Sequence, residues 1–323
     1  MAETLTPEDI RERYGDLPFI TPYSRIVALL GRDGLVELHE FHARDRCGGG
    51  AAWEVYHYAG TSPLVLSARR EGARNIFVCE QGRCELKLEP GIAGAGLEEV
   101  RVSGNEVEIT YAGLAGGGVA ATLCRGMADN VISTVVHERG GGATMGRATL
   151  RVPVASKLVV GVDDTDDDKK GATWSTMNEL SFELEQEGAC EYLGHVIVQL
   201  FPENPHKTTN CCSTAVLLGA RPGHEEALAE TIRGMLAARI YSDECGMAFY
   251  TRVGIPYELR EYSARTRSRM VDIEETHLIA RRCGVSLREV TGERGLIGAL
   301  AALGAHDDPD GAVRVRRAGG MGG

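Results

Sequence analysis

The 323-residue sequence lacks any apolar run near the roughly 18 residues that a membrane-spanning helix needs. Its first residues, MAETLTPEDIRERYGD, also lack the basic-then-apolar pattern of a signal peptide. These two absences argue against a membrane partner and against export. We therefore expect a cytoplasmic protein.

Cysteine pairs of the CxxC kind are absent too, although the chain contains nine cysteines. An odd number spread over a chain of this length is not a disulfide framework, and without CxxC pairs a structural zinc site is disfavoured. Cys211 and Cys212 are adjacent. We interpret the cysteines as reduced, partly buried thiols.

Positive charge is in deficit, with 35 Lys and Arg against 46 Asp and Glu, which gives a net charge of −11. This balance argues against a general nucleic-acid binder, although it leaves room for a local basic groove. No Walker A motif occurs, so any nucleotide site is of another type. Residues 116–121 fit G-x-G-x-x-A, but no βαβ unit surrounds them, and we read them as tight turns or a loop that approaches phosphate.

The pattern of the first half is mostly that of strands. We expect strands in WEVYHYAG, NIFVCEQGRCELKLE and VRVSGNEVEITYAG, the last two as hairpins. Thr6 and Pro7 predict the start of a short helix before them. Pro153 to Ser156 resemble a linker. This half is therefore predicted to be a β-rich domain.

From residue 157 strands and helices alternate. KLVVGV is a buried-type strand, and the next segment places Trp174, Met177, Leu180 and Leu184 on one helical face. Two strands, YLGHVIVQLF and CSTAVLLGA, precede an amphipathic helix at 224–240. Two further helices are predicted near 257–268 and 272–283.

Five aspartates follow the strand KLVVGV in KLVVGVDDTDDDKKGATWST, residues 157–176. A solvated loop is the usual meaning of such a run, but here it stands at the carboxyl end of a strand, where ligands bind in α/β layers. Like carboxylates repel unless a cation neutralises them. The glycine and glutamate spacing of a calcium EF-hand is not met. The remaining reading is magnesium bridging to phosphates, with Lys169, Lys170 and the turn at 171–173 opening a helix.

A second polar constellation is FPENPHKTTNCCST, residues 201–214, in which Lys207 could offset phosphate charge. An ordinary polar loop is the equal alternative. A third, Ser242 to Gly246, could complete a metal or amine site, although an ordinary loop is the commoner meaning.

These segments together resemble the archaeal tRNA-isoleucine 2-agmatinylcytidine synthetase. The matching stretches are GVDDTD at 161–166, NPHKTTN at 204–210 and GERGLIGALAALG at 292–304. The resemblance covers 157–306 and implies a kinase-like ATP-binding domain followed by a ferredoxin-like domain. It also implies that ATP and magnesium activate a nucleobase carbonyl, and that a threonine after the motif is phosphorylated. Thr173 and Ser175 are the candidates.

The whole layout resembles methanogenesis marker protein 11, on the stretches EVYHYAGTSPLVLSARREG, YAGLAGGGVAAT and VVGVDDTDDDKKGATW. The resemblance implies a methane-producing archaeon. The synthetase's C-terminal oligonucleotide-binding barrel and zinc ribbon have no counterpart in this sequence. With the acidic charge, this argues against the same tRNA substrate.

We predict an α+β fold with four regions: a β-rich N-terminal domain that recognises substrate or partner (1–155), a DDTD-type kinase-like α/β ATP-binding domain (156–254), the rest of a ferredoxin-like α+β region (255–306) and a flexible tail (307–323). ATP and Mg²⁺ are the expected cofactors. The catalytic and metal-binding candidates are Asp163, Asp164 and Asp166, with Lys207 as a further catalytic residue. The candidate cofactor-binding residues are Thr165, Lys170, Gly171, Thr173, Ser175, Thr208, Asn210 and Arg294.

The main functional hypothesis is a Mg-ATP-dependent enzyme that activates a carbonyl or carboxylate oxygen by phosphoryl transfer in a methanogenesis-associated maturation step. Its partner is an unknown small molecule, protein or RNA. One alternative is a non-catalytic nucleotide-binding accessory factor. Another is an RNA-modifying enzyme related to the agmatinylcytidine synthetase, with a basic stripe at Arg69, Arg70, Arg74 and Arg83.

Overall fold

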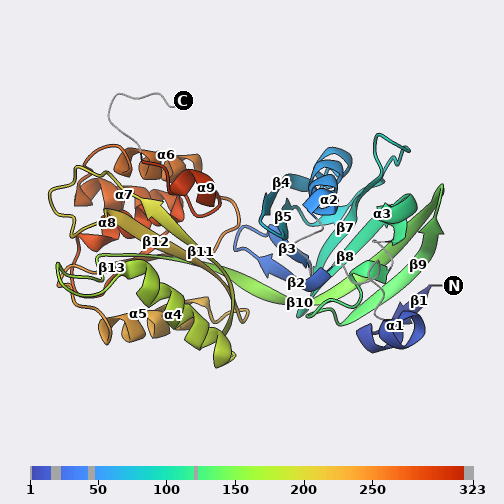
Figure 1. Cartoon of the computed structure of the whole chain (residues 1–323), viewed down its shortest axis with the longest axis horizontal. Coiled ribbons are helices and arrows are strands. Elements are labelled where there is room, and N and C mark those ends of the chain that lie inside the picture. Colours follow the sequence, from blue (N-terminus) through green and yellow to red (C-terminus); the bar gives the residue numbers. More distant parts are fainter. Residues whose placement is uncertain (1, 16–22, 43–47, 120–122, 316–323) are drawn as a thin grey trace. The chain divides into compact units, whose positions relative to one another are not determined.

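The computed structural model describes residues 2–15, 23–42, 48–119 and 123–315 (Figure 1). The chain divides into two compact units, Met1–Ala155 and Ser156–Gly323, called unit 1 and unit 2 here. Both mix strands with helices. The long strand β10, Thr144–Asp163, begins in the first unit and ends in the second. Within the described residues, none of the helices has both the length and the apolar character that a bilayer crossing requires.

Unit 1 is a large antiparallel sheet with a few helices. The strands β4-β5-β3-β2-β10-β8-β7-β6 follow one another in hydrogen-bonded order, and β9 pairs with β10 and β1. The strand bounds are β1 Glu3–Leu5, β2 Tyr23–Leu30, β3 Val36–His42, β4 Val65–Glu71, β5 Arg74–Cys79, β6 Gly82–Arg83, β7 Ala95–Ser103, β8 Glu106–Gly113 and β9 Ser133–Gly141. The helices are α1 Pro7–Tyr14, α2 Gly48–Thr61 and α3 Ala115–Val119.

Two sequence predictions for this half are confirmed. Helix α1 begins with Thr6 as its cap, because the Thr6 side chain accepts a hydrogen bond from the Asp9 backbone N–H at 3.2 Å. Strands β7 and β8 form the predicted hairpin, and Gly104 takes a positive φ of 61° in its turn.

The prediction of a strand in WEVYHYAG is wrong, because the segment lies in helix α2. Its buried residues Ala51, Glu54, His57 and Tyr58 recur at the three- and four-residue spacing of one helical face. The predicted hairpin NIFVCEQGRCELKLE is also wrong. Strand β5 pairs with β3 and β4, whereas β6 pairs with β7. The aromatic and β-branched residues are present, but tertiary packing decides their partners.

The predicted linker at Pro153 to Ser156 lies inside strand β10, so this prediction is wrong as well. Pro153 is the last residue paired with β8, and Ser156 is the first paired with β12. A proline without an N–H is tolerated there because the hydrogen-bonding partners change. The G-x-G-x-x-A stretch begins in α3, but residues 120–122 lie outside the described residues.

The core of unit 1 contains a buried charge cluster. The Arg125 guanidinium, fully buried, donates to both Glu40 oxygens at 2.8 and 2.9 Å and lies 3.6 Å from Glu54. The rings of Tyr23 and Tyr111 flank it at 4.4 and 4.2 Å. The cluster joins strands β2, β3 and β8 to helix α2.

Unit 2 is a sheet with helices on two faces. Its strands run in the order β11-β12-β10-β13-β14, all antiparallel. The bounds of the strands that begin and end in this unit are β11 Cys190–Gln199, β12 Cys212–Ala220, β13 Gly246–Tyr250 and β14 Ser286–Glu289. The helices are α4 Thr173–Gln186, α5 Glu225–Ala237, α6 Tyr257–Thr266, α7 Ile273–Cys283, α8 Gly295–Leu303 and α9 Pro309–Ala312.

Helices α4 and α5 lie together on one face of this sheet, and α6, α7 and α8 lie on the other (Figure 1). Met177, Leu180 and Leu184 of α4 are buried as predicted, whereas Trp174 is 51% exposed. Helix α9 falls in the predicted tail and is held by Arg267, which donates to the Ala312 carbonyl at 3.1 Å. Residues 316–323 lie outside the described residues.

Helix α8 meets the sheet at backbone contact. A Cβ added at Gly161 of β10 would lie 3.1 Å from the Ala299 carbonyl carbon, and one at Gly246 of β13 would lie 2.5 Å from the Gly295 carbonyl carbon. Glycine is therefore required on both strands. This close approach places the first turn of α8 against the end of β10, where the aspartates begin.

Candidate functional site

A cavity of about 270 Å³ opens at the carboxyl end of strand β10 in unit 2. Residues from the aspartate loop, from the 200–212 segment, from the connection between α6 and α7, and from the first turn of α8 surround it. The lining residues are Asp163, Asp164, Asp166, Leu200, Phe201, Asn204, His206, Lys207, Thr208, Asn210, Cys211, Cys212, Thr266, Arg269, Met270, Val271, Arg294, Ile297 and Gly298.

Asp163 is the last residue of β10, and its carboxylate lies against helix α8. A Cβ at Gly298 would lie 2.6 Å from the Asp163 Cγ, so no side chain fits at position 298. Burial raises the pKa of Asp163 well above its usual range, and the neighbouring Asp164 carboxylate raises it further. Asp163 is thus a carboxylate whose ionised form needs a nearby positive charge.

Asp164, the next residue, has a left-handed backbone with φ at 57°. Its Oδ2 lies 3.4 Å from the Nε of Arg294, the residue before helix α8. Burial raises the pKa of Asp164, and the Arg294 charge opposes that rise. The strained residue aims the second carboxylate at a cation.

Asp166 is held by two threonines from different segments. Its Oδ2 accepts a hydrogen bond from Thr208 at 2.8 Å, and its Oδ1 accepts one from Thr173 at 3.1 Å. Thr173 is the first residue of α4 and also accepts from the Thr165 hydroxyl at 3.1 Å. The 201–211 loop and the start of α4 are thereby joined at one carboxylate.

The structure gathers most of the predicted residues around the cavity but not all. Seven of them line it, namely Asp163, Asp164, Asp166, Lys207, Thr208, Asn210 and Arg294. Five are not among the lining residues, namely Thr165, Lys170, Gly171, Thr173 and Ser175. Thr165 and Thr173 are buried behind Asp166, and the ammonium of Lys170 lies 5.7 Å from the ring of Tyr241. The Lys207 ammonium donates to the Pro202 carbonyl.

The sequence reasoning missed the wall formed by the connection between α6 and α7. Thr266, Arg269, Met270 and Val271 line the cavity from there. They lie about a hundred residues after the aspartates in the chain. Only the packing of α6 against α8 brings them to the site, so the sequence carried no signal for them.

Two thiols also face the cavity. Burial raises the pKa of Cys211 to about 12, with the Asp163 charge adding to the effect, and burial raises the pKa of Cys212 as well. Both thiols are therefore protonated at neutral pH and are poor nucleophiles.

Among the described residues, no group of three or more His, Cys, Asp or Glu side chains is arranged to hold a metal ion. Magnesium in nucleotide sites uses one or two protein carboxylates together with substrate phosphates and water. Asp163 and Asp164 fit that requirement, because both have carboxylates whose ionised form is disfavoured by burial. A cation beside them would relieve that cost.

Comparisons with known proteins show what this chain is similar to. Residues 159–235 match the family model of the TiaS TCKD domain, and this confirms the resemblance to the agmatinylcytidine synthetase over that range. The uncharacterized protein MJ0921 of Methanocaldococcus jannaschii is 41% identical over 282 residues, which are 87% of this chain and 93% of that protein. The resemblance to methanogenesis marker protein 11 stays a prediction.

Solved structures show a weaker likeness. The complex of TiaS with an isoleucine tRNA and ATP matches with 21% identity and a TM-score of 0.42, and covers 46% of this chain and 36% of that chain. A tRNA fluorescent labeling enzyme matches with 22% identity and a TM-score of 0.42, over 46% and 36% of the two chains. Each likeness thus spans about a third of the solved chain.

Proposed function

The chain belongs to the same family as the M. jannaschii protein MJ0921, and from this premise and the cavity at the end of β10 we propose that it is an ATP-dependent enzyme. The triphosphate of ATP, with Mg²⁺, occupies the cavity beside Asp163, Asp164 and Asp166. The γ-phosphoryl group is transferred to a carbonyl or carboxylate oxygen of the acceptor. An amine or another nucleophile then displaces the phosphate.

The observation that supports this proposal is the charge arrangement of the cavity. Three carboxylates and three cationic side chains, those of Lys207, Arg269 and Arg294, line one cavity. Phosphoryl transfer needs mainly positioning and charge stabilisation, which such a set supplies. The match to the TiaS TCKD domain over 159–235 supports the same assignment.

Each residue that lines the charged part of the cavity has a defined task in the proposal. Asp163 and Asp164, with Asp166 as the third candidate ligand, would hold a magnesium ion, which would neutralise phosphate charge. Arg294, which lies 3.4 Å from Asp164 and 3.9 Å from Glu244, would offset the charge of the phosphates. Lys207 exchanges the Pro202 carbonyl for a phosphate oxygen. The hydrogen bond from Thr208 to Asp166 would hold the 201–211 loop against the aspartate loop.

Three of the five predicted residues outside the cavity lining act through Asp166. Thr165 and Thr173 fix Asp166 through their hydroxyls. Gly171 has a φ of 92°, and a Cβ there would lie 2.9 Å from the Asp166 Cβ, so it allows the aspartate loop to fold tightly. We keep Lys170 and Ser175 as proposed phosphate contacts at the start of α4.

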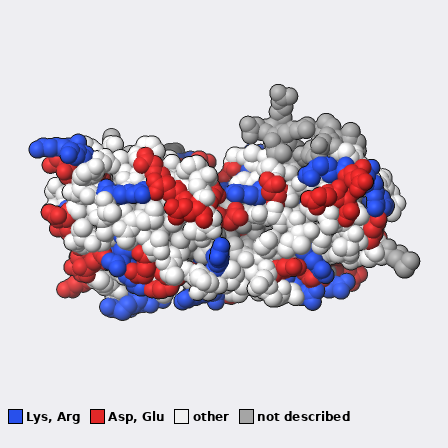
Figure 2. Space-filling model, turned by 90° about the horizontal axis from the view of Figure 1, so that it is seen from below, with Lys and Arg blue, Asp and Glu red and all other residues white. Residues whose placement is uncertain are grey.

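The acceptor class favoured by the TiaS match is RNA, which was the alternative hypothesis, over a cofactor or enzyme in a methanogenesis-associated step. Most arginines of the basic stripe expected for RNA binding already have partners within the protein. Arg69 and Arg74 pair with Glu71, and Arg70 donates to the Gly48 carbonyl. Figure 2 shows acidic and basic side chains interspersed on the visible face of each unit. RNA contacts would therefore be local.

Labelled ATP tests the proposal. The purified protein is incubated under anaerobic conditions with Mg²⁺ and ATP, and nucleotide binding, transferred label and the nucleotide product are measured. Asp164→Asn is expected to lose binding and product. Asp168→Asn is the matched control, since Asp168 is exposed and does not line the cavity.

Each result has a defined meaning. Binding without turnover, when RNA is supplied as acceptor, would favour the non-catalytic accessory factor. No binding at millimolar ATP by folded wild-type protein would overturn the proposed function.

A further inference from the structure

The connection between α6 and α7, residues 267–272, is a fixed wall of the cavity. Three of its residues, Arg269, Met270 and Val271, line the cavity. Met270 is 46% exposed and Arg269 is exposed, so this wall lies at the opening to solvent. Side chains there would meet a ligand at the mouth of the cavity.

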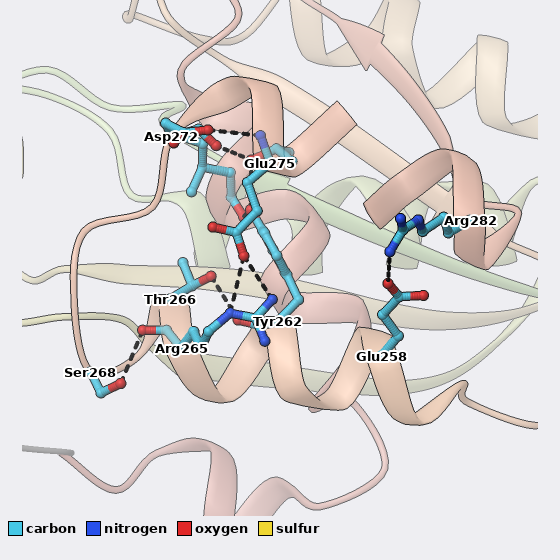
Figure 3. A network of polar contacts seen from close by, with 10 residues as sticks. Glu258, Tyr262, Arg265, Thr266, Ser268, Asp272, Glu275 and Arg282 are labelled. Carbon is cyan, nitrogen blue, oxygen red and sulfur yellow. Dashed lines mark hydrogen bonds and ion pairs between the residues drawn. The ribbon is translucent and has the colours of Figure 1, made fainter. Parts of the chain in front are cut away.

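A network of polar contacts holds both ends of this connection (Figure 3). The Arg265 guanidinium near the end of α6 donates twice to Glu275 of α7, with N–O distances of 3.0 and 2.7 Å. Asp272 caps α7 by accepting from the Glu275 N–H at 2.7 Å. The two helices are thereby clamped at the point where the connection leaves and returns.

The clamp also contacts helix α8, which forms another part of the cavity lining. The Tyr262 hydroxyl lies 2.7 Å from the Thr276 hydroxyl and 3.2 Å from the carbonyl of Ile297 in α8. Ile297 and Gly298 line the cavity, and Gly298 contacts Asp163. The position of the 267–272 wall relative to the aspartates is thus set by the fold.

Arg269 stands out among the cations of the cavity. Arg294 lies beside Asp164, and Lys207 donates to a backbone carbonyl. Over the described ranges, the structure shows no hydrogen bond or ion pair for the Arg269 side chain, although its backbone N–H donates to the Arg265 carbonyl at 2.9 Å. The carboxylates that follow it, Asp272 and Glu275, are occupied by the cap and by the clamp. Its charge is therefore uncompensated by its own segment.

We propose that Arg269 is a phosphate-binding residue at the opening of the cavity. The inference rests on the proposed function. A guanidinium offers planar paired donors that match phosphate oxygens, and a phosphate that enters a cavity with three carboxylates needs such a partner. The phosphate belongs either to the γ position of the nucleotide or to the backbone of an RNA acceptor.

Binding measurements on the whole chain separate these sources. Arg269→Ala is compared with wild type for ATP, ADP and inorganic tripolyphosphate in the presence of Mg²⁺, and for a short single-stranded oligoribonucleotide at low salt. Loss of a charge-assisted contact is expected to lower the affinity for the affected probe about tenfold or more. Arg282→Ala is the matched control, because Arg282 is an exposed arginine of the same helix pair that contacts Glu258 at 2.8 Å outside the cavity.

The outcomes decide between the sources. A loss for ATP and tripolyphosphate with ADP unchanged assigns the γ-phosphate. A loss for the oligoribonucleotide alone assigns the acceptor backbone. Unchanged affinity for every probe overturns the inference on Arg269 and leaves the proposed function standing. Wild-type protein that binds none of the probes overturns both.

Discussion

The carboxylate of Asp163 lies directly against the Cα of Gly298. A methyl group added at that Cα would lie 2.6 Å from the Asp163 Cγ and would overlap the carboxylate. Gly298→Ala must therefore displace Asp163 or helix α8. We expect nucleotide affinity to fall at least tenfold and the protein to lose on the order of 1–3 kcal/mol of stability through overpacking.

A glycine in another helix provides the control for this substitution. A Cβ at Gly234 in α5 would meet no atom within 4 Å. Gly234→Ala is expected to raise stability by about 0.5–1 kcal/mol and to leave nucleotide binding unchanged. Calorimetric titration and thermal unfolding measure both. Equal behaviour of the two variants would contradict the role of Gly298.

Thr208 is expected to act through Asp166. Thr208→Val removes the 2.8 Å hydrogen bond to the Asp166 carboxylate while keeping the shape of the side chain. We expect Mg-ATP affinity to fall by about tenfold, because a hydrogen bond to a charged group contributes about 1.5 kcal/mol. Thr208→Ser should restore most of it. Thr209→Val, at an exposed neighbour outside the cavity, should bind as wild type.

Glu54 is expected to make unit 1 less stable as pH rises. Burial raises the pKa of Glu54 to about 7 from its usual 4.5. Between these values the folded state holds a proton that the unfolded state releases, so the contribution of Glu54 to stability falls as pH rises through that window. Burial lowers the pKa of His39 to about 4. The contribution of His39 to stability therefore rises as pH rises from about 4 to 6.5.

The comparison with Glu54→Gln isolates the first effect. The difference in unfolding free energy, wild type minus variant, should fall by up to about 3 kcal/mol between pH 5 and 7.5. Trp53 lies in unit 1 and Trp174 in unit 2, so urea titrations in a Trp174→Phe background report on unit 1 by fluorescence. A difference that stays constant with pH would refute the assignment.

Arg125 is expected to contribute strongly to the stability of unit 1. Arg125→Met leaves the Glu40 carboxylate, fully buried, without its cation, so a loss of about 3–5 kcal/mol is expected. Arg101→Met breaks an ion pair with Glu108 at a side chain that is 57% exposed, and should destabilise the protein far less than Arg125→Met. Urea titration of both variants tests the difference. Comparable losses would show that the buried cluster adds nothing specific.

The sequence predicted the second half of the chain better than the first. Alternation of apolar runs and amphipathic segments identified the buried faces of α4 and α5, since Leu180, Leu184, Leu228 and Ile232 recur at helical spacing and are buried. WEVYHYAG failed because its apolar and polar residues alternate as in a strand, while the buried face of α2 includes Glu54 and His57, which hydropathy cannot identify as core.

The candidate site was predictable to the extent that local sequence marks it. Asp163, Asp164 and Asp166 follow a strand, and Lys207 and Thr208 occupy a loop between strands, so both could be placed at a sheet edge. Arg269 could not, because its place in the cavity depends on how α6 and α7 pack on α8. The α4 start carries positive and backbone N–H groups as expected, but its side chains support Asp166 from behind.

The glycines of GLIGALAALG allow the backbone of α8 to approach the backbone of the sheet closely. Gly295 and Gly298 are required where α8 touches the strand ends and Asp163, and the small residues that follow them, Ala299, Ala301 and Ala302, are fully buried. A shared stretch of this kind therefore reports a shared architecture for holding the first aspartate. It carries no information about which molecule would receive a phosphoryl group in the proposed reaction.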